Sequence, residues 1–399
     1  MARISKNDKG VIKMKKDYSV LILGFFGSIY IVDFVKSLKK ENPSSHIFFW
    51  GAEPEDKSAI TQEYLDCYDE YCFHDLNQKF KRIPILCQLE TIYLWRKNFN
   101  KFAGSKRFDV TNIHFIYYAY VYILDYIKKY SSCLVLTPWG SDVYRIGSKE
   151  KLILRYLYRF ADYITGRNDG FTKDVLRIFK IPKSKFVQVF LGSSVIDYIK
   201  QEKDFINAIE AKKLLGINDS YVITCGYNAN SAQNHLGIIE AINKVKDYLP
   251  QNIILLFPFT YGSNKEYVDM VKRRVEEYNL RALFFEDFLD IHHLFLLRQA
   301  TDMFIHVQST DAGNASLREY LFCEKKVING EWIRYEDLEI NGTVPYFIAK
   351  DLKSLDKTIM EAFKSDPINI SEATIKIIEE KSWKSAIKGW DNFFSEIAS

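Results

Sequence analysis

The chain has 399 residues, of which 47% are hydrophobic, 15% aromatic and 27% charged. This composition excludes disordered and fibrous proteins, and the length fits two globular domains better than one. The formal net charge is +4, but residues 1–16 alone carry +5, so the rest of the chain is nearly neutral at −1. The charge therefore gives no signature of nucleic-acid binding, and we expect no nucleic-acid partner.

The basic arm at residues 1–16 lacks the apolar core and cleavage site of a secretory signal. It fits either a solvated terminus or a contact with anionic lipid headgroups. No apolar run is long enough to predict a transmembrane helix. The six cysteines form no CxxC pair, which indicates a reducing compartment. We therefore expect a cytoplasmic protein that can reach the inner face of the cell membrane.

Along the chain, short apolar runs alternate with longer stretches of helical periodicity, in two series. The first series comprises 20–23, 47–50, 71–73, 110–115, 134–137, 163–165 and 186–190. The second comprises 221–225, 253–257, 282–285, 303–307, 326–328 and 346–348. Continuous apolar runs separated by helices indicate buried parallel strands. We predict an α/β fold of two Rossmann-like, doubly wound domains in tandem.

The charged stretch 197–218 separates the two strand series and marks the domain boundary. We predict an N-terminal Rossmann-like domain at 17–198 and a C-terminal one at 199–370. The last segment, 371–399, has helical periodicity and no strand after it. We expect this segment to pack back toward the first domain.

In such folds, ligands bind outside the carboxyl ends of the strands, so the residues that follow each strand are the first candidates. The strand at 222–225 leads into Gly226 and a run of small polar residues ahead of a helix. Such a turn leaves backbone N–H groups free to hold a phosphate. An ordinary strand-to-helix turn has the same sequence pattern, so the two interpretations stay open.

The strand at 303–307 is followed by small residues, Gly313 to Ser316, at the expected start of a helix. A helix start favours an anion because its N–H groups are unpaired. Glu319 lies on this helix, and its carboxylate could accept hydrogen bonds from two sugar hydroxyls. Alternatively, Ser316 and Glu319 form a capping box and need no ligand.

In the first half, His114 lies at the end of the strand at 110–115, and Asp142 follows the strand at 134–137. Either side chain could act as a general base or position a hydroxyl. A structural histidine and a helix N-cap are the competing interpretations.

Several segments resemble known enzymes: FDVTNIHF, LTPWGSDVYR, ADYITGRN, CGYNANSAQNHLGIIEAI and VQSTDAGNASLREYLFCEKKVING. Together with the tandem α/β design, they resemble nucleotide-sugar glycosyltransferases of the GT-B fold, in particular the retaining family four. The stretch LLFPFTYGSNKEYV, with the QNHL motif, resembles bacterial transferases that add sugars to lipid-linked intermediates. The resemblance extends over nearly the whole chain, from residue 18 to about 363.

The resemblance implies a transfer of sugar from a nucleotide diphosphate, most simply a UDP-sugar, to a glycan or lipid-linked glycan in surface polysaccharide or glycoconjugate synthesis. In that family two acidic residues separated by seven others flank the donor, and Asp311 and Glu319 have this spacing. By analogy, Glu319 would hold the ribose and Asp311 would lie near the transferred sugar, with retention at the sugar carbon.

The expected site residues fall into three groups. The catalytic candidates are Asp311, His114 and Asp142. The donor-binding candidates are Gly226, Asn228, Asn234, His235, Tyr261, Gly313, Asn314, Ala315, Ser316 and Glu319. The acceptor-binding candidates are Gly27, Trp139, Tyr117 and Tyr118.

The chain departs from the family pattern near the phosphate loop. The family usually has an Arg and a Lys there, whereas this chain offers Asn228, Asn234 and His235. Many members have a His where this chain has Trp139 and Gly140, and Asp311 stands where Glu is common. The missing basic pair keeps a catalytically inactive partner subunit open as an alternative, and a nucleotide-sugar epimerase is a second one.

We expect no cofactor and no metal, because there is no Asp-x-Asp pair and no zinc-ligand spacing among the seven histidines. A Tyr-rich stretch at 117–130, followed by basic and aromatic residues at 149–159, fits three interpretations. These are core packing, a membrane or lipid-linked acceptor contact, and single-stranded nucleic-acid binding.

Overall fold

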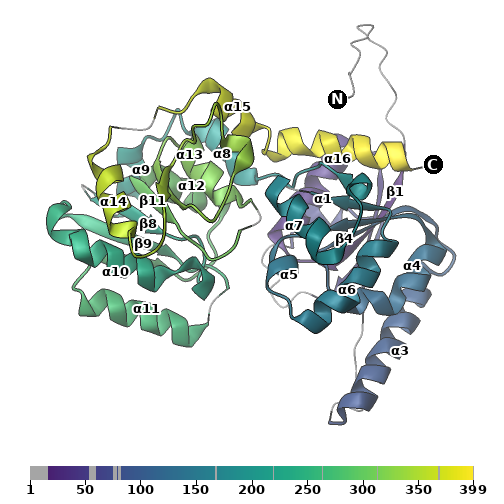
Figure 1. Cartoon of the computed structure of the whole chain (residues 1–399). Helices are drawn as coiled ribbons and strands as arrows, with labels where there is room; N and C mark the ends of the chain where they lie inside the picture. The colour runs from purple at the N-terminus through teal and green to yellow at the C-terminus, as the bar shows by residue number, and fades with distance from the viewer. Residues whose placement is uncertain are drawn as a thin grey trace, which may run out of the picture. The chain divides into compact units, whose positions relative to one another are not determined.

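The computed structural model describes residues 17–53, 60–74, 79, 82–166, 169–218, 220–262, 264–311, 313–366 and 369–398. The basic arm at 1–16 lies outside this part of the chain. Both predicted series of strands form, as two separate sheets. Figure 1 shows helices on the faces of these sheets. The prediction of two doubly wound α/β domains in tandem is therefore confirmed.

The first sheet has seven strands in the order β3-β2-β1-β4-β5-β6-β7. The strands are β1 (Ser19–Phe25), β2 (His46–Ala52), β3 (Glu70–Phe73), β4 (Phe108–His114), β5 (Ser131–Thr137), β6 (Tyr163–Thr165) and β7 (Phe186–Val187). The helices between them are α1 (Ile29–Glu41), α2 (Gln62–Leu65), α3 (Pro84–Ala103), α4 (Leu124–Tyr130), α5 (Ser141–Tyr144), α6 (Ser148–Phe160) and α7 (Asp169–Phe179). The direction of the strand order reverses between the neighbouring strands β1 and β4, and ligands bind to sheets of this kind at such a reversal.

The second sheet has six strands in the order β10-β9-β8-β11-β12-β13. These are β8 (Tyr221–Cys225), β9 (Ile253–Pro258), β10 (Ala282–Phe285), β11 (Met303–His306), β12 (Lys326–Gly330) and β13 (Phe347–Ala349). The helices of this half are α8 (Ser194–Glu202), α9 (Ala208–Leu214), α10 (His235–Val245), α11 (Lys265–Glu277), α12 (Ile291–Ala300), α13 (Ala315–Phe322), α14 (Leu355–Lys364) and α15 (Glu372–Glu379). Here the order reverses between β8 and β11, which pair in parallel.

Apolar side chains from both faces of the second sheet explain why its strands are continuous apolar runs. Val222, Leu256 and Phe304 pack with helices on one face, and Ile223, Leu255 and Ile305 pack on the other. Because neighbouring side chains of a strand point to opposite faces, a strand buried on both sides needs an apolar residue at every position.

The last helix, α16 (Trp383–Ile397), returns to the first sheet. Contacts between Cα atoms divide the chain into two compact units, residues 1–113 with 122–135 and 390–399, and residues 114–121 with 136–389. Within the first unit, the Trp390 ring packs 4.9 Å from Phe34 of α1, and Asp391 accepts a hydrogen bond from Tyr18 at 3.0 Å. The helix thus crosses back as predicted, whereas the domain boundary near residue 198 stays a prediction.

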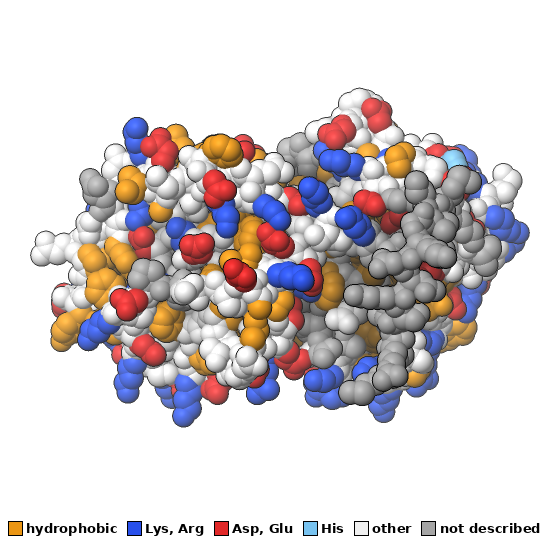
Figure 2. Space-filling model, turned by 90° about the horizontal axis from the view of Figure 1, so that it is seen from above, with side chains coloured by type: hydrophobic (Ala, Val, Ile, Leu, Met, Phe, Trp, Pro, Cys, Tyr) orange, Lys and Arg blue, Asp and Glu red, His pale blue; other side chains and the backbone are white. Residues whose placement is uncertain are grey.

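On the described residues of the face shown in Figure 2, basic and acidic side chains are intermixed. This agrees with the nearly neutral charge of the chain outside its first 16 residues. None of the helices in the described part of the chain is both long and apolar enough to cross a bilayer.

Candidate active site

The β8–α10 loop forms a compact cradle at the carboxyl end of the second sheet. Gly226 opens it with a φ of 65°, a conformation that favours glycine. The amide oxygen of Asn228 accepts from the backbone N–H of Asn230 at 3.0 Å. Asn234 closes the loop in the left-handed conformation and serves as the N-cap of α10. Hydrogen bonds from its own side chains therefore hold the loop. Asn is frequent in it because an Asn side chain can bond to nearby backbone groups and because Asn tolerates the left-handed conformation.

The structure brings this loop together with the β11–α13 loop. The backbone N–H of Ser309 donates to the Ala232 carbonyl at 2.7 Å. The Asn234 side chain donates to the Val307 carbonyl at 2.6 Å. The two predicted donor loops thus form one structure, with the N-termini of α10 and α13 at the same edge of the sheet.

Helix α13 begins at Ala315, with Asn314 as its N-cap. The Asn314 side chain accepts from the backbone N–H of Ser316, and Gly313 turns with a φ of 84°. The capping box considered for Ser316 and Glu319 is therefore not formed, because the helix starts before Ser316. The start of α13 is the geometry that favours an anion.

Asp311 lies beside this helix start in a buried acid–base cluster. Its side chain is 5% exposed and accepts from the Tyr335 hydroxyl and from the backbone N–H of Asn314. His306 Nε2 lies 3.7 Å from the Asp311 carboxylate, and His306 Nδ1 lies 2.8 Å from the Asn329 side-chain oxygen. If Nδ1 carries the proton, Nε2 points its lone pair toward Asp311.

Burial sets the protonation states of His306 and Tyr335 in this cluster. Desolvation lowers the pKa of His306, against the opposing effect of Asp311, so the imidazole is neutral at neutral pH. Desolvation, followed by the charge of Asp311, raises the pKa of Tyr335 well above its ordinary value, so the phenol stays a donor. The sequence pointed to Asp311 by its spacing but missed His306, Asn329 and Tyr335. They follow or end strands at the same edge, which is the signal that could have found them.

A second network surrounds Gln308, next to Asp311 in the same loop. Its side-chain oxygen accepts from Tyr227 at 2.8 Å and from Gln233 at 2.9 Å. Its backbone carbonyl accepts from the Trp332 indole at 2.7 Å. These bonds join the segments after β8, β11 and β12, so the floor of the candidate donor site is preorganised.

Glu319 is buried, and both of its carboxylate oxygens accept hydrogen bonds. It is 4% exposed, and one oxygen accepts from Ser193 at 2.8 Å. The other accepts from Arg298 Nε at 3.1 Å and from a terminal nitrogen of Arg298 at 3.0 Å. This environment fits a structural ion pair, and a contact with ribose would have to compete with these bonds.

His235 also lies in the interior. It has no exposed surface, and its Nδ1 lies 3.2 Å from the Tyr267 hydroxyl. Burial lowers its pKa to about 3. In this arrangement the buried ring packs beneath the β8–α10 loop. The side chain of Tyr261 is exposed, and its backbone carbonyl accepts a hydrogen bond from the backbone N–H of Ala229 in that loop at 2.9 Å.

At the first sheet, Asp142 organises the strand ends instead of facing solvent. It is 2% exposed, and its carboxylate accepts from three backbone N–H groups, those of Ile116 at 2.7 Å, Trp139 at 2.9 Å and Gly140 at 2.7 Å. His114 has no exposed surface and meets the half-buried Trp139 ring edge-on. Both residues are placed to hold the loops, and a role as a general base would require them to become accessible.

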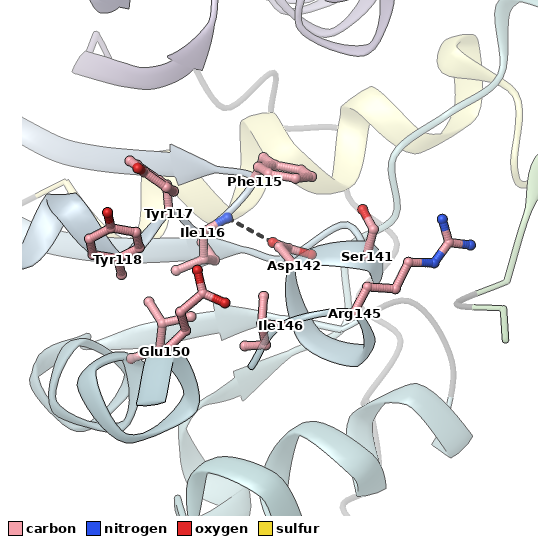
Figure 3. A pocket seen from close by; sticks show the side chains of 10 residues that line it. Phe115, Ile116, Tyr117, Tyr118, Ser141, Asp142, Arg145, Ile146 and Glu150 are labelled. Carbon is pink, nitrogen blue, oxygen red and sulfur yellow. Dashed lines mark hydrogen bonds between the residues drawn. The ribbon is translucent and has the colours of Figure 1, made fainter. Parts of the chain in front are cut away.

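A cavity of about 320 Å³ lies beside these loops. Figure 3 shows the Asp142 carboxylate at the edge of this cavity, where it accepts a hydrogen bond from the backbone N–H of Ile116. The predicted acceptor residues Tyr117 and Tyr118 line the cavity, together with Phe115, Ser141, Arg145, Ile146, Glu150 and Leu154. Mostly apolar walls with a few polar groups are typical of ligand sites.

The Tyr-rich stretch forms a 3₁₀ segment, Tyr118–Ile123, and then α4. Tyr120 and Tyr130 are buried, whereas Tyr117 is 43% exposed. Core packing therefore accounts for part of the stretch, and Tyr117 lines the cavity with part of its surface exposed. Gly27 lies in the turn between β1 and α1. Among the described residues, no group of three His, Cys, Asp or Glu side chains is placed to hold a metal ion.

No protein-family model and no curated protein sequence matches the chain. Several solved structures are similar to the chain over nearly its whole length. A glycosyltransferase from Rickettsia africae has 16% identity and a TM-score of 0.67, with 96% of this chain and 98% of that chain covered. HepE from Anabaena, in complex with UDP-glucose, has 13% identity and a TM-score of 0.64, with 95% and 96% covered. The lipopolysaccharide outer core galactosyltransferase WaaB has 11% identity and a TM-score of 0.64, with 96% and 100% covered. These similarities establish the GT-B fold of the chain.

Proposed function

We propose that the chain is a glycosyltransferase that moves a sugar from a nucleotide-diphosphate donor to a saccharide acceptor. The observation that carries the proposal is that the β8–α10 and β11–α13 loops are hydrogen-bonded to each other, through Ser309 and Asn234. These bonds bring the N-termini of α10 and α13 to the same edge of the second sheet as the buried carboxylate of Asp311. Such N–H groups stabilise negative charge on a leaving diphosphate without a bound cation.

In this proposal the donor lies on the second sheet. The diphosphate lies against the backbone at Gly226–Asn230 and Gly313–Ser316, and Asp311 lies near the transferred sugar. Binding uses backbone N–H groups of these segments other than those that donate to protein oxygens, which belong to Gly226, Ala229, Asn230, Asn314 and Ser316. UDP is the simplest donor nucleotide, because the HepE structures of similar fold contain UDP or UDP-glucose. Glu319 serves in this account mainly to fix α13, whose N-terminus does the binding.

The acceptor lies at the first sheet in this proposal, near Gly27, Trp139, Tyr117 and Tyr118. Tyrosine rings offer flat apolar faces for a sugar and hydroxyls for its oxygens. We further propose a retaining reaction in the synthesis of a surface polysaccharide or glycoconjugate, supported by the spacing of Asp311 and Glu319 and by the similar fold of WaaB.

Thermal-shift titration with UDP, GDP, TDP and CDP tests the donor site. A ligand at a hundredfold excess over its Kd stabilises the folded state by about 2.7 kcal/mol. We expect UDP to raise Tm in the wild type and Asn234→Ala to lose most of this shift. Asn279→Ala is the matched control, because Asn279 is also left-handed, with φ of 50° against 60° for Asn234.

The outcomes separate the alternatives. A UDP shift with no release of sugar from UDP-glucose, even with added glycans, would favour the inactive partner subunit. Conversion of the donor sugar without an acceptor would favour the epimerase. The absence of a shift with all four nucleotides would contradict the donor site itself. If backbone N–H groups neutralise the diphosphate, the UDP shift persists in EDTA.

A further inference from the structure

Helix α6 separates two kinds of surface. Leu154, Leu157 and Tyr158 are buried on its inner side, and Glu150 and Leu154 line the cavity of Figure 3. On its outer side, Leu152 is 67% exposed, Ile153 39% and Tyr156 50%. These three residues follow the i, i+1, i+4 spacing of one helix face, so they form a continuous apolar stripe.

Cations flank this stripe. Lys149 precedes it and Arg159 follows it, and both are exposed. Neither side chain forms an ion pair with any residue in the described part of the chain. The carboxylate of Glu150, the single acidic side chain of α6, accepts from the backbone N–H of Gly147 at 2.9 Å, at the start of the helix. The outer face is therefore apolar along its centre and positive at both ends.

We propose that α6 docks on the surface of a bilayer that contains anionic lipids, with Leu152, Ile153 and Tyr156 inserted among the acyl chains. A helix with Lys and Arg beside exposed Leu, Ile and Tyr matches the composition of helices that lie in a membrane interface. The cations at both ends of the stripe complement anionic headgroups, which attract each basic residue near the surface by about 1 kcal/mol, so the charge pattern favours a surface of anionic lipids.

The docking face borders the cavity. Ile153 follows Glu150 by three residues, so the two side chains are neighbours on the helix surface, and Glu150 lines the cavity. Docking would bring the cavity to the headgroup level, where the sugar of a lipid-linked acceptor lies. This last step rests on the proposed function, whereas the docking itself does not.

Vesicle flotation of the full chain tests the docking, with vesicles of phosphatidylcholine alone and vesicles that also contain phosphatidylglycerol. We expect binding to the anionic vesicles. The variant Leu152→Ser/Ile153→Ser and the variant Lys149→Gln/Arg159→Gln should each lower the partition coefficient by about tenfold. The control is Ile209→Ser/Leu214→Ser on α9, which removes an apolar pair that is 79% and 53% exposed.

Absence of wild-type binding to both kinds of vesicle would overturn the proposal. So would unchanged binding of the α6 variants, or an equal loss in the α9 control. Sedimentation velocity of the same variants adds a further arm, since loss of a dimer on α6 substitution would assign the stripe to a second copy of the chain. UDP shifts in the α6 variants should equal the wild-type shift, so a failure of the donor site is distinguishable from a failure of docking.

Discussion

At the scale of single residues, the candidate site is a set of buried polar groups that are held in place by hydrogen bonds to other side chains. Asp311 is held by the Tyr335 hydroxyl, and Glu319 by Arg298 and Ser193. The two acidic residues that the sequence treats as a pair thus have different surroundings. Asp311 adjoins the helix start that can bind an anion, and Glu319 is enclosed by protein groups.

The Arg298–Glu319 pair leads to a prediction about stability and binding. Glu319→Gln or Arg298→Met should destabilise the fold by about 3–5 kcal/mol, because one buried charge is left without its partner. The double variant Arg298→Met/Glu319→Leu should recover much of this loss. Urea unfolding measures the three variants.

UDP binding by the double variant decides the role of Glu319. A folded double variant that still gives the UDP shift supports a structural role. A folded double variant without the shift would restore the contact with ribose that the sequence resemblance implies.

His235 makes the stability depend on pH. Burial lowers its pKa to about 3 in the folded chain, against about 6.5 when unfolded. The unfolded state therefore binds more protons between these values, and stability falls as the pH drops through 6.5 toward 3. The slope is about 1.4 kcal/mol per pH unit for one such group, and burial of His306 and His74 acts in the same direction.

Urea midpoints measured between pH 7.5 and 5 check this expectation. His235→Leu should show a shallower decline than the wild type over this range. Equal slopes for the two proteins would show that His235 is protonated in the folded state or does not titrate in the range.

At the scale of elements, the central part of each strand was predictable, because strands buried on both faces are continuous apolar runs. The start of α13 was not, since Asn314 and Ser316 are both good N-cap residues and local sequence does not rank them. The partners of Asp311 were also beyond sequence reasoning. Tyr335 lies 24 residues away from it, and only the parallel arrangement of β11 and β12 brings these segments together.

The N-cap of α13 gives an element-scale prediction. Asn314→Ala removes the side-chain bond to Ser316 and should cost about 1 kcal/mol of stability. It should also weaken the UDP shift, because the N-terminus of α13 frays where the diphosphate is proposed to bind. Asn264→Ala is the control, since Asn264 is the N-cap of α11 and its side chain accepts from the backbone N–H of Tyr267.

Urea unfolding and thermal shift together check the pair of variants. Both variants should lose similar stability, and only Asn314→Ala should lose nucleotide affinity. A similar loss of UDP affinity in both would show a general effect of stability and would count against α13 as the anion site.

At the scale of the whole molecule, the first unit is built from segments distant in sequence. Trp390 has no exposed surface and packs against Phe34 and Phe394. Asp391 accepts from Tyr18 and from Asn42 at 2.9 Å. The periodicity of the last segment predicted a helix that returns, but the residues it would meet could not be inferred from sequence.

The packing of α16 against α1 predicts that removing one side chain, that of Trp390, lowers the free energy of unfolding substantially. Trp390→Ala should cost about 3–5 kcal/mol, since it leaves a cavity in a buried aromatic cluster. Phe205→Ala should cost little, because Phe205 is 81% exposed. Denaturant unfolding followed by tryptophan fluorescence and by circular dichroism measures both, and a cost below about 1 kcal/mol for Trp390→Ala would contradict the role given to α16.

The return of α16 also sets an order of events during protein synthesis. Tyr18, in the first unit, acquires its partner Asp391 only after a further 373 residues have been translated. Domains generally fold as they emerge from the ribosome, the N-terminal one first. Here the unit that begins to emerge first is completed only by residues 390–399, so its α1 surface stays uncovered until α16 has been translated.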